Sequence, residues 1–580
     1  MRFKQVLVAI SGAMGHHRTI VEKGIMTELK ISQRKVTKLA PGDNVAVALV
    51  DLPAGARVDL SGVPQDVITP VPAKHKFALN DLTKGSDVVM YGVVVGEVTA
   101  AIRKGERIST ENLRHRSGPI QARCSGYTWH APDVSRWRNT TFQGYRRSDG
   151  QIGTRNCWLV VPLVFCENKN LESLQRAFGY SLGDSQPEVY ERHVADLAQL
   201  YRAGRLDEIQ SYTFPDYGAP GHASKVFRNV DGVMFLTHTM GCGGTRDDAR
   251  ALCGIIAGYI HNPNVAGATI LSLGCQNAQP NLLREEIQRR DLKFDKPLFI
   301  FDQQQSQLEC QMLQGAIRET FRGLMEADKA RRSSAPLSAL TVGLKCGGSD
   351  GFSGISANPA IGHTSDLLCA LGARTILSEF PELCGAEQNL VDRCVNFEIA
   401  EKFLHLMKAY NARAQAIGSG FDSNPSPGNI RDGLITDAMK SAGAARKGGT
   451  SPVTDVLDYP EYATKPGLNL LCTPGSDVEA VSAQVGSGAN IVLFTTGLGT
   501  PAGNAIAPVL KIATNSELAA RMSDIIDLDT GAIIRGEATI EEMGEKVLDL
   551  IVKTASGEVR AKAEDNRQED FIPWKRGVSL

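Results

Sequence analysis

The sequence predicts an α/β protein, with a small β domain near the N-terminus and a larger α/β region after it. Between residues 43 and 113, short apolar segments alternate with turn residues. After about residue 140, apolar strands alternate with amphipathic helices, a pattern typical of parallel sheets flanked by helices. Glycine, cysteine and hydroxyl residues recur where these strands end. Because open α/β sheets bind ligands at the carboxyl ends of their strands, this recurrence predicts a functional site there.

The β domain is predicted over residues 35–115. Its strand-sized segments are 45–50, 76–79, 88–95 and 96–102, with turns at Pro53-Ala54-Gly55, Asp81 and Lys104-Gly105. Residues 1–34 precede it as an extension that we expect to be mobile. Residues 116–139 follow it, and their proline and scattered polar residues without periodicity indicate a linker.

The α/β region is predicted as two domains, 140–335 and 336–580. Its expected strands are 233–236, 268–273, 297–301, 340–344, 374–377 and 490–494, and its expected helices include 247–260, 281–289 and a long helix that ends near residue 327. Such repeated strand–helix units imply mainly parallel sheets.

Composition excludes several classes of function. The chain has 580 residues, 42% of them hydrophobic, so it should form several domains. A net charge of -1 gives no electrostatic case for a nucleic-acid partner or an anionic membrane surface. No apolar run approaches the roughly 20 residues that span a bilayer. The 12 cysteines are scattered without a C-x-x-C pair, which favours a reducing, cytoplasmic setting.

The most informative segment is the loop 346–354, which follows the expected strand 340–344. It combines four glycines with Cys346, Ser349, Asp350 and Ser353. Glycines allow a close approach to a ligand, and the other side chains bind polar substrates, protons or metals. A tight turn with Asp350 as a helix N-cap is a strong alternative interpretation.

Cysteines and a histidine mark other strand exits. Cys242, Cys275 and Cys346 each lie beside glycine, so they are either ligands for ferrous iron, zinc or an iron–sulfur cluster, or small buried apolar side chains. His238 follows a strand directly and is a candidate base or metal ligand, with a capping or core histidine as the alternative. His75 lies beside Lys76 in the β domain.

Further candidates are carboxylates at strand ends and a rigid turn. Glu379 and Asp302 end strands, and Asn424 begins an Asn-Pro-Ser-Pro-Gly-Asn turn suited to amide contacts with a polyhydroxy ligand. The loop 497–504 has glycines that weakly resemble a dinucleotide-binding fingerprint. Its third glycine is displaced and Pro501 interrupts it, so it gives little support to a nicotinamide dehydrogenase.

Taken together, these segments resemble the altronate/galactarate dehydratase family of sugar-acid dehydratases. The segments that carry the resemblance are 43–48, 75–76, 91–92, 144–150, 153–156, 238–242, 274–275, 346–359, 378–379, 424–429 and 494–499. Segments 303–305, 385–388 and 577–580 are more similar to the altronate branch than to the galactarate branch.

The resemblance implies a β-clip (SAF-like) N-terminal domain and a Rossmann-like C-terminal part. It also implies a divalent metal, Fe²⁺ with Mn²⁺ as an alternative, and loss of water from a sugar acid such as altronate to give a 2-keto-3-deoxy acid. A small-molecule substrate is then the expected partner, and a homo-oligomer is compatible with the sequence. Alternatives are a galactarate-type dehydratase, a sulfolactate sulfo-lyase and a non-catalytic sugar-acid-binding protein.

One departure concerns the metal. Altronate-type members carry V-H-x-H-N where this chain reads Ile108-Ser109-Thr110-Glu111-Asn112, so both histidines are replaced. A second departure is Ile430, where a lysine commonly follows the turn. We therefore consider Glu111, Cys242 and Cys275 as metal ligands, with His115 as a weaker substitute.

The resulting hypothesis assigns roles as follows. His238 is the base or acid, and His75 with Lys76 forms its partner across a cleft between the β domain and the catalytic body. Arg146 or Arg155 binds the substrate carboxylate through the bidentate contacts that arginine favours. The residues expected to bind the polyol are Cys346, Ser349, Asp350, Ser353, Asn358, Glu379 and Asn424.

Overall fold

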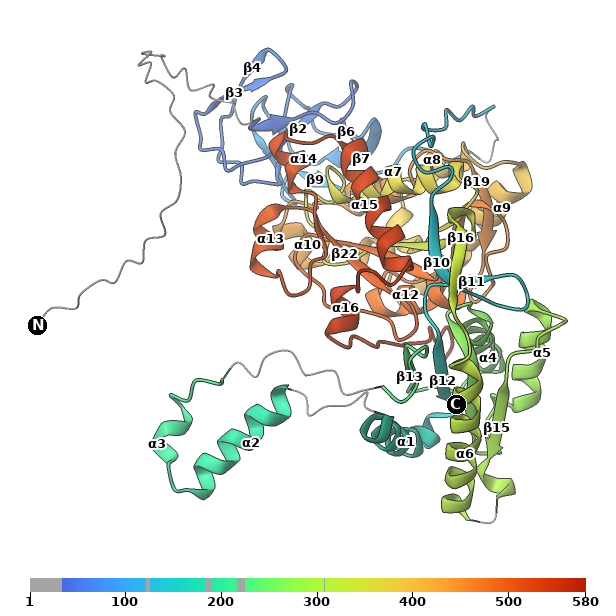
Figure 1. Cartoon of the computed structure of the whole chain (residues 1–580). Helices are drawn as coiled ribbons and strands as arrows, with labels where there is room; N and C mark the ends of the chain where they lie inside the picture. The colour runs from blue at the N-terminus through green and yellow to red at the C-terminus, as the bar shows by residue number, and fades with distance from the viewer. Residues whose placement is uncertain (1–33, 122–125, 183–188, 216–224, 307) are drawn as a thin grey trace, which may run out of the picture. The chain divides into compact units, whose positions relative to one another are not determined.

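The computed structural model describes residues 34–121, 126–182, 189–215, 225–306 and 308–580, and residues 34–580 fall in one compact unit (Figure 1). The expected N-terminal extension lies outside the described residues except for Arg34. None of the described helices has the length and apolar character needed to cross a membrane.

The β domain is antiparallel throughout. Its strands are β1 (Val36–Thr37), β2 (Val45–Ala48), β3 (Arg57–Leu60), β4 (Val63–Asp66), β5 (Lys76–Ala78), β6 (Asp87–Met90), β7 (Val93–Val98), β8 (Arg107–Ile108) and β9 (Leu113–Arg114). They form the sheets β1-β2-β5-β8, β3-β4 and β6-β7-β9. The single strand expected over 88–95 is wrong, because Tyr91 and Gly92 have φ of 60° and 77° and turn the chain into the β6–β7 hairpin. Two consecutive residues with positive φ are typical of a two-residue hairpin turn.

The middle of the chain contains a four-stranded parallel sheet in the order β13-β12-β14-β15. Its strands are β12 (Cys157–Pro162), β13 (Gly232–Phe235), β14 (Val265–Ser272) and β15 (Leu298–Asp302). A separate antiparallel sheet joins β10 (Thr141–Arg146), β11 (Ile152–Gly153) and β16 (Arg332–Pro336). The helices of this part are α1 (Asn168–Leu182), α2 (Val189–Arg202), α3 (Leu206–Ile209), α4 (Arg246–His261), α5 (Pro280–Arg290) and α6 (Glu309–Ala327), with single 3₁₀ turns η1 (Phe165–Glu167) and η2 (Gln303–Gln305).

The C-terminal part is built on a seven-stranded parallel sheet in the order β19-β20-β18-β17-β21-β22-β23. Its strands are β17 (Thr341–Cys346), β18 (Arg374–Leu377), β19 (Val453–Leu457), β20 (Gly467–Leu471), β21 (Ile491–Thr496), β22 (Val509–Ala513) and β23 (Leu528–Asp529). The expectation of mixed α/β architecture with parallel sheets is confirmed, and the Rossmann-like detail stays a prediction.

Ten helices of this part surround or extend the sheet in the described residues 337–580 (Figure 1). They are α7 (Ala357–Ala370), α8 (Glu387–Val391), α9 (Phe397–Ala416), α10 (Pro427–Arg431), α11 (Asp437–Ala445), α12 (Asp477–Gly486), α13 (Ser516–Arg521), α14 (Gly531–Arg535), α15 (Ile540–Ala555) and α16 (Lys562–Asp565). The 3₁₀ turns are η3 (Leu337–Ala339), η4 (Phe380–Leu383), η5 (Phe421–Ser423) and η6 (Arg446–Gly448).

The β domain and the C-terminal part share a hydrophobic core. Buried residues of the β domain, including Val88 and Val95, pack with Phe352, Ala438 and Met439. Strand β7 thereby lies against α11. This contact matters for the site, because Phe352 belongs to the glycine-rich loop and α11 carries charged residues described below.

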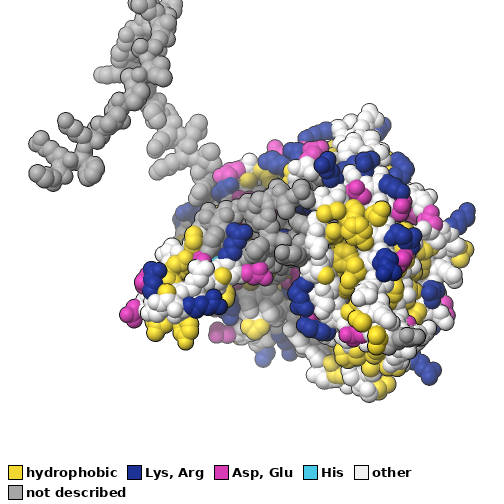
Figure 2. All heavy atoms as spheres, turned by 60° about the horizontal axis from the view of Figure 1, so that its bottom comes forward, with side chains coloured by type: hydrophobic (Ala, Val, Ile, Leu, Met, Phe, Trp, Pro, Cys, Tyr) yellow, Lys and Arg dark blue, Asp and Glu magenta, His cyan; other side chains and the backbone are white. Residues whose placement is uncertain are grey.

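Surface charge is mixed. On the face shown in Figure 2, lysine and arginine side chains lie in small groups among acidic, polar and hydrophobic side chains. This distribution agrees with the net charge of -1 and shows no continuous basic surface on that face.

Candidate active site

A cavity of about 490 Å³ opens where β17 ends in the glycine-rich loop. That volume accommodates a small metabolite, since ligand pockets typically measure about 300–1,000 Å³. Polar side chains in its wall are Cys346, Ser349, Glu382, Ser423, Asn424, Ser426, Asn429, Lys440, Ser476 and Asp477. They come from β17 and the loop after it, η4, η5, the turn before α10, α10 itself, α11 and the start of α12, so the cavity is assembled from distant parts of the sequence.

A buried network of charges lies behind Cys346. Lys447 donates to Cys346 Sγ at 2.8 Å and also to Glu379 Oε2. Lys345 pairs with the other oxygen of Glu379 and reaches Asp477 Oδ1 at 3.1 Å. Lys345 and Glu379 are completely buried and Lys447 is 1% exposed, so solvent does not screen the two pairs that Glu379 forms.

A second pair lies at the cavity wall itself. Lys440 Nζ donates to Glu382 Oε1 at 2.9 Å and to Asn424 Oδ1 at 2.7 Å. The Cys346 thiol donates to the other oxygen of Glu382 at 3.3 Å, which joins the two groups of charges. Asn429 Nδ2 donates to the Ser349 carbonyl at 2.7 Å and fixes the loop against α10. Lys440 and Glu382 therefore present a positioned cation and anion to a ligand in the cavity.

Burial and neighbouring charges set the protonation states. Burial raises the pKa of the Cys346 thiol to about 12, and Glu379 adds to the rise, so the thiol stays protonated at neutral pH. Burial alone would raise the pKa of Glu382, but Lys440, followed by Lys345 and Lys447, lowers it to about 2. Burial acts to lower the pKa of Lys345 and of Lys447, and the adjacent acidic groups outweigh it and raise both. The lysines are thus cationic and Glu382 is ionised.

Three consecutive residues of the β domain contact the glycine-rich loop or the segment 431–433 at the end of α10. Lys74 Nζ lies 3.1 Å from Asp350 Oδ2 and 2.9 Å from Asp432 Oδ1. His75 Nε2 lies 3.0 Å from the Arg431 carbonyl. Lys76 is completely buried and donates to the Gly433 carbonyl at 2.6 Å, and burial lowers its pKa to about 7. The predicted residues His75 and Lys76 are thus brought to the back of the loop, although neither lines the cavity.

The seven predicted polyol-binding residues divide into three groups. Cys346, Ser349 and Asn424 line the cavity, whereas Glu379 is buried behind it. The remaining three, Asp350, Ser353 and Asn358, are buried and bonded within the protein: Ser353 Oγ donates to Asp350 Oδ1 at 3.0 Å, and Asn358 bonds to the Gly443 carbonyl and Thr495 Oγ1. In this conformation they support the loop and do not face a ligand.

His238 has both ring nitrogens bonded to the backbone. Nε2 donates to the Pro162 carbonyl at 2.7 Å, and Nδ1 accepts from the Met240 N–H at 3.1 Å. Burial lowers the pKa of His238 to about 4, so the imidazole is neutral. It is absent from the cavity wall at Cys346. The expected cleft with His238 facing His75 is therefore not formed, because His238 turns into the core beside β12.

This placement predicts a pH effect on stability. His238 is neutral in the folded protein down to about pH 4, whereas the unfolded chain binds a proton below about 6.5, so stability falls as pH drops through that window. In His238→Gln this contribution, up to about 3 kcal/mol, should disappear. Urea unfolding midpoints at pH 7 and pH 4.5 measure it. Equal pH dependence in both proteins would mean that the imidazole is not held neutral.

The two predicted arginines do not line the cavity. Arg155 is 6% exposed and forms a bidentate pair with Glu564 at 2.6 and 2.8 Å, which holds α16 against the body. Arg146 is exposed on β10. The expected carboxylate clamp by Arg146 or Arg155 is thus not found at this cavity, because the guanidinium of Arg155 is paired with Glu564 and Arg146 is not among the lining residues.

Sequence reasoning missed five charged residues of the site. They are Lys345, Glu382, Lys440, Lys447 and Asp477. Lys345 directly precedes Cys346, and Glu382 lies three residues after Glu379. Because Cys346 and Glu379 were already candidates, these two neighbours could have been predicted from the sequence. Lys440 and Lys447 lie about 100 residues away from Cys346, and spacing alone gives no indication that they fold onto it.

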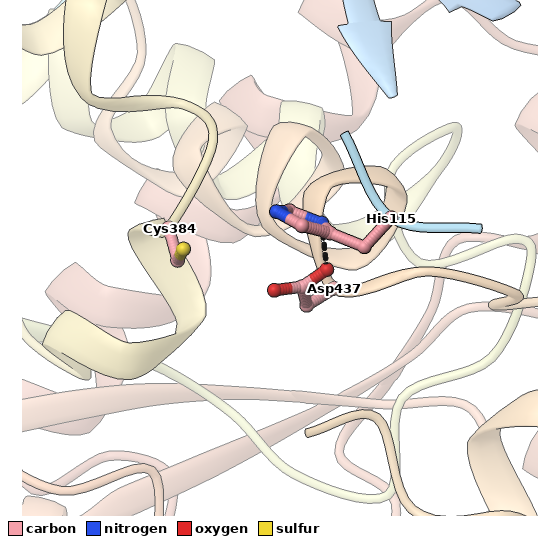
Figure 3. Close-up of side chains that lie close together, drawn as sticks. All are labelled: His115, Cys384 and Asp437. Carbon is pink, nitrogen blue, oxygen red and sulfur yellow. Dashed lines mark ion pairs between the residues drawn. The ribbon is translucent and has the colours of Figure 1, made fainter. Parts of the chain in front are cut away.

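Three groups of side chains in the described part of the chain place potential ligand atoms within 4.8 Å of one another. They are His115–Cys384–Asp437, Asp149–His261–Asp291 and Cys346–Glu379–Glu382. The first, shown in Figure 3, brings an imidazole from the end of the β domain beside Asp437 at the start of α11, with Cys384 just after η4. Glu111 is exposed and belongs to none of these groups.

Comparisons with known proteins point to the same family along most of the chain. Family models described as an altronate/galactarate dehydratase SAF domain, a second domain and a C-terminal domain match residues 34–116, 144–328 and 337–579. Altronate dehydratase of Escherichia coli is 35% identical over 93% of this chain and 98% of its own length. Altronate dehydratase of Bacillus subtilis is 34% identical over 94% and 99%. Galactarate dehydratase (L-threo-forming) of E. coli is 32% identical over 92% and 95%. The chain belongs to the altronate/galactarate dehydratase family, and its N-terminal β domain is an SAF domain.

Proposed function

We propose that this protein is a hydro-lyase that removes water from a sugar acid, with an aldonate such as altronate as substrate and a 2-keto-3-deoxy acid as product. The family and the names of three relatives support the class of reaction. The observation that carries the proposal is the buried lysine–carboxylate network that ends at a 490 Å³ cavity lined by amides and hydroxyls. Amides and hydroxyls suit a polyol, and a positioned ammonium suits a carboxylate.

The chemistry explains why a cation is needed. The hydrogen on C2 of a sugar acid is weakly acidic, because removing it places a second negative charge on the carboxylate oxygens. A positive charge that is already fixed where this dianion forms lowers the barrier without reorganisation. Lys440 supplies such a charge at the wall of the cavity, with its ammonium held by Glu382 and Asn424.

Glu382 is the proposed proton acceptor. Its pKa is low because Lys440 is its strongest cationic neighbour, and burial acts in the opposite direction. A substrate carboxylate that binds Lys440 competes with Glu382 for the ammonium, and the burial effect then makes Glu382 a stronger base. Glu382 takes the C2 proton, and the resulting carboxylic acid protonates the departing C3 hydroxyl. Water leaves, and the enol that remains becomes the keto acid.

The cation implied by the family resemblance requires ligands of its own. The group Cys346–Glu379–Glu382 does not fit it, since the ammonium groups of Lys345, Lys447 and Lys440 already bind these atoms. The group His115–Cys384–Asp437 fits Fe²⁺ or Mn²⁺ better, because it offers nitrogen, sulfur and oxygen donors together and the ion pair within it, His115 with Asp437, joins two of the donors themselves (Figure 3). Cys384 lies two residues after Glu382, and Asp437 lies one helical turn before Lys440. A divalent ion held there would supply additional positive charge beside the cavity.

This assignment predicts a change in metal affinity. His115→Ala and Asp437→Asn should each weaken Mn²⁺ binding by more than about tenfold, since even outer-shell partners of a metal site cost 10–100-fold. Equilibrium dialysis with Mn²⁺ measures the affinity directly. Glu111→Gln is the matched control, because Glu111 is an exposed carboxylate of the same domain. Unchanged affinity in both variants would rule out this donor set.

Substrate profiling tests the function itself. Purified protein with added Fe²⁺ or Mn²⁺ is incubated with altronate, galactarate, other aldonates and aldarates, and sulfolactate, and the keto acid is quantified. We expect keto-acid formation with an aldonate and the highest kcat/KM for altronate. Sulfite release from sulfolactate would indicate the sulfo-lyase alternative. Binding of a sugar acid without any turnover would indicate a non-catalytic protein and would overturn the proposal.

A further inference from the structure

Three cysteines follow three neighbouring parallel strands of the middle sheet. Cys166 lies in η1 after β12, Cys242 follows β13, and Cys275 follows β14. The sheet order is β13-β12-β14, and all three strands run in the same direction. Their carboxyl ends therefore meet at one edge of the sheet, and the three thiols lie on adjacent loops there. All three side chains are exposed.

Hydrogen bonds hold these loops together. The Phe165 N–H, next to Cys166, donates to the Met240 carbonyl at 3.0 Å. The Asn277 N–H donates at 2.9 Å to the carbonyl of Gly241, next to Cys242, which joins the second and third loops. Gly241 has φ of 100°, and a Cβ there would lie 2.0 Å from the Leu163 carbonyl oxygen. The close approach of the loops therefore depends on glycine at this position.

The thiols also interact electrostatically. Cys242 and Cys275 both lie close enough to Cys166 to act on its thiol. The three sulfur atoms nevertheless do not all lie within 4.8 Å of one another, unlike the groups of described residues given above. Thiolates on one tetrahedral zinc lie about 3.8 Å apart, given Zn–S bonds of about 2.3 Å. A wider triangle suits a cofactor in which each thiolate binds a different metal atom.

We propose that Cys166, Cys242 and Cys275 hold an iron–sulfur cluster of the four-iron type, with three irons bound by the protein and the fourth left open. Soft thiolate donors select iron–sulfur clusters, and three of them leave one coordination position for a water or a small oxyanion. Cys242 also lines a cavity of about 250 Å³ together with Lys575 and Ser579. A cation and a hydroxyl beside an open iron suit an anionic ligand.

This site differs from the proposed active site. The 250 Å³ cavity shares no lining residue with the 490 Å³ cavity among the described residues, and Cys346 belongs to the latter, bonded to Lys447 and Glu382. The expected grouping of Cys346 with Cys242 and Cys275 is thus replaced by one in which Cys166 is the third thiol. That residue lies in η1, shortly after the buried strand β12, and was not a sequence-based candidate.

Anaerobic reconstitution of the full chain with Fe²⁺ and sulfide tests the proposal. The wild-type protein should gain the broad visible absorption of a cluster and bind about four irons and four sulfides per chain. Cys166→Ser, Cys242→Ser and Cys275→Ser should each retain less than about a third of the iron, with unchanged circular dichroism. Cys369→Ser is the control, since Cys369 lies in α7 and bonds to Thr375 and Ser451.

Three other results would each overturn the proposal. One zinc per chain without sulfide would indicate a mononuclear site, and a wild-type protein that binds no iron would exclude a cluster. Equal iron content in the three serine variants and the control would place the iron elsewhere. Because the readout is metal and sulfide content, it is independent of turnover. Failure of the cluster proposal can therefore be distinguished from failure of the proposed dehydratase function.

Discussion

Lys440→Met is expected to lower kcat/KM for the sugar acid by about 10²–10⁴-fold, the usual contribution of one positioned acid–base or charged group. Methionine keeps the apolar stem and removes the ammonium that Glu382 and Asn424 orient at the cavity wall. Since the charge acts mainly on the developing dianion, kcat should fall more than KM rises. Steady-state kinetics of keto-acid formation measure both constants.

Two further variants separate catalysis from folding. Lys440→Met leaves Glu382 buried without its strongest cation, so the double variant Lys440→Met/Glu382→Gln should recover stability and remain inactive. Lys402→Met removes a half-exposed lysine of α9 that pairs with Glu461 and should leave kinetics unchanged. Activity within threefold of wild type in Lys440→Met would refute the role of the ammonium.

Glu379→Gln should destabilise the protein by about 3–5 kcal/mol, the usual cost of removing one partner from a buried ion pair. Glu379 is completely buried and neutralises both Lys345 and Lys447. Glutamine keeps the shape but leaves two buried ammonium groups undercompensated. The shift of the denaturant midpoint at pH 7 measures the effect.

The matched control for this experiment is Glu398→Gln. Glu398 is exposed in the first turn of α9, where surface substitutions usually change stability by less than about 0.5 kcal/mol. A loss below about 1 kcal/mol in Glu379→Gln would mean that Glu379 is already protonated, and that the two lysines find their counter-charge in Asp477 and Glu382.

The fold was largely predictable because strand and helix patterns are local. Strand β18 matches the expected range 374–377, and helix α4 differs from the expected 247–260 by one residue at each end. The β6–β7 hairpin was missed because Val88–Val95 is apolar across the turn, and only the Tyr91-Gly92 dipeptide marks the reversal.

Part of the site was predictable from loops of unusual composition. Cys346, Ser349 and Asn424 lie in two such loops and line one cavity, and their role in substrate binding stays a prediction. His238 also follows a strand, yet its side chain is buried and bonds to the Pro162 carbonyl. The sequence pattern does not show which way a side chain at a strand end points. Lys440 lies in α11 and Lys447 in η6 directly after it, and neither segment has an unusual composition. Their place in the site becomes visible only in the three-dimensional structure.

The salt bridge between Lys74 and Asp350 makes the SAF domain and the C-terminal part of the chain interdependent. Asp350 has no exposure to water, and its charged neighbour at 3.1 Å comes from the SAF domain. A fragment that lacks residues 34–116 would leave this carboxylate without that counter-ion and uncover Phe352 and Met439. The SAF domain thus stabilises the glycine-rich loop. The SAF domain and the C-terminal part should therefore be produced together when either is assayed.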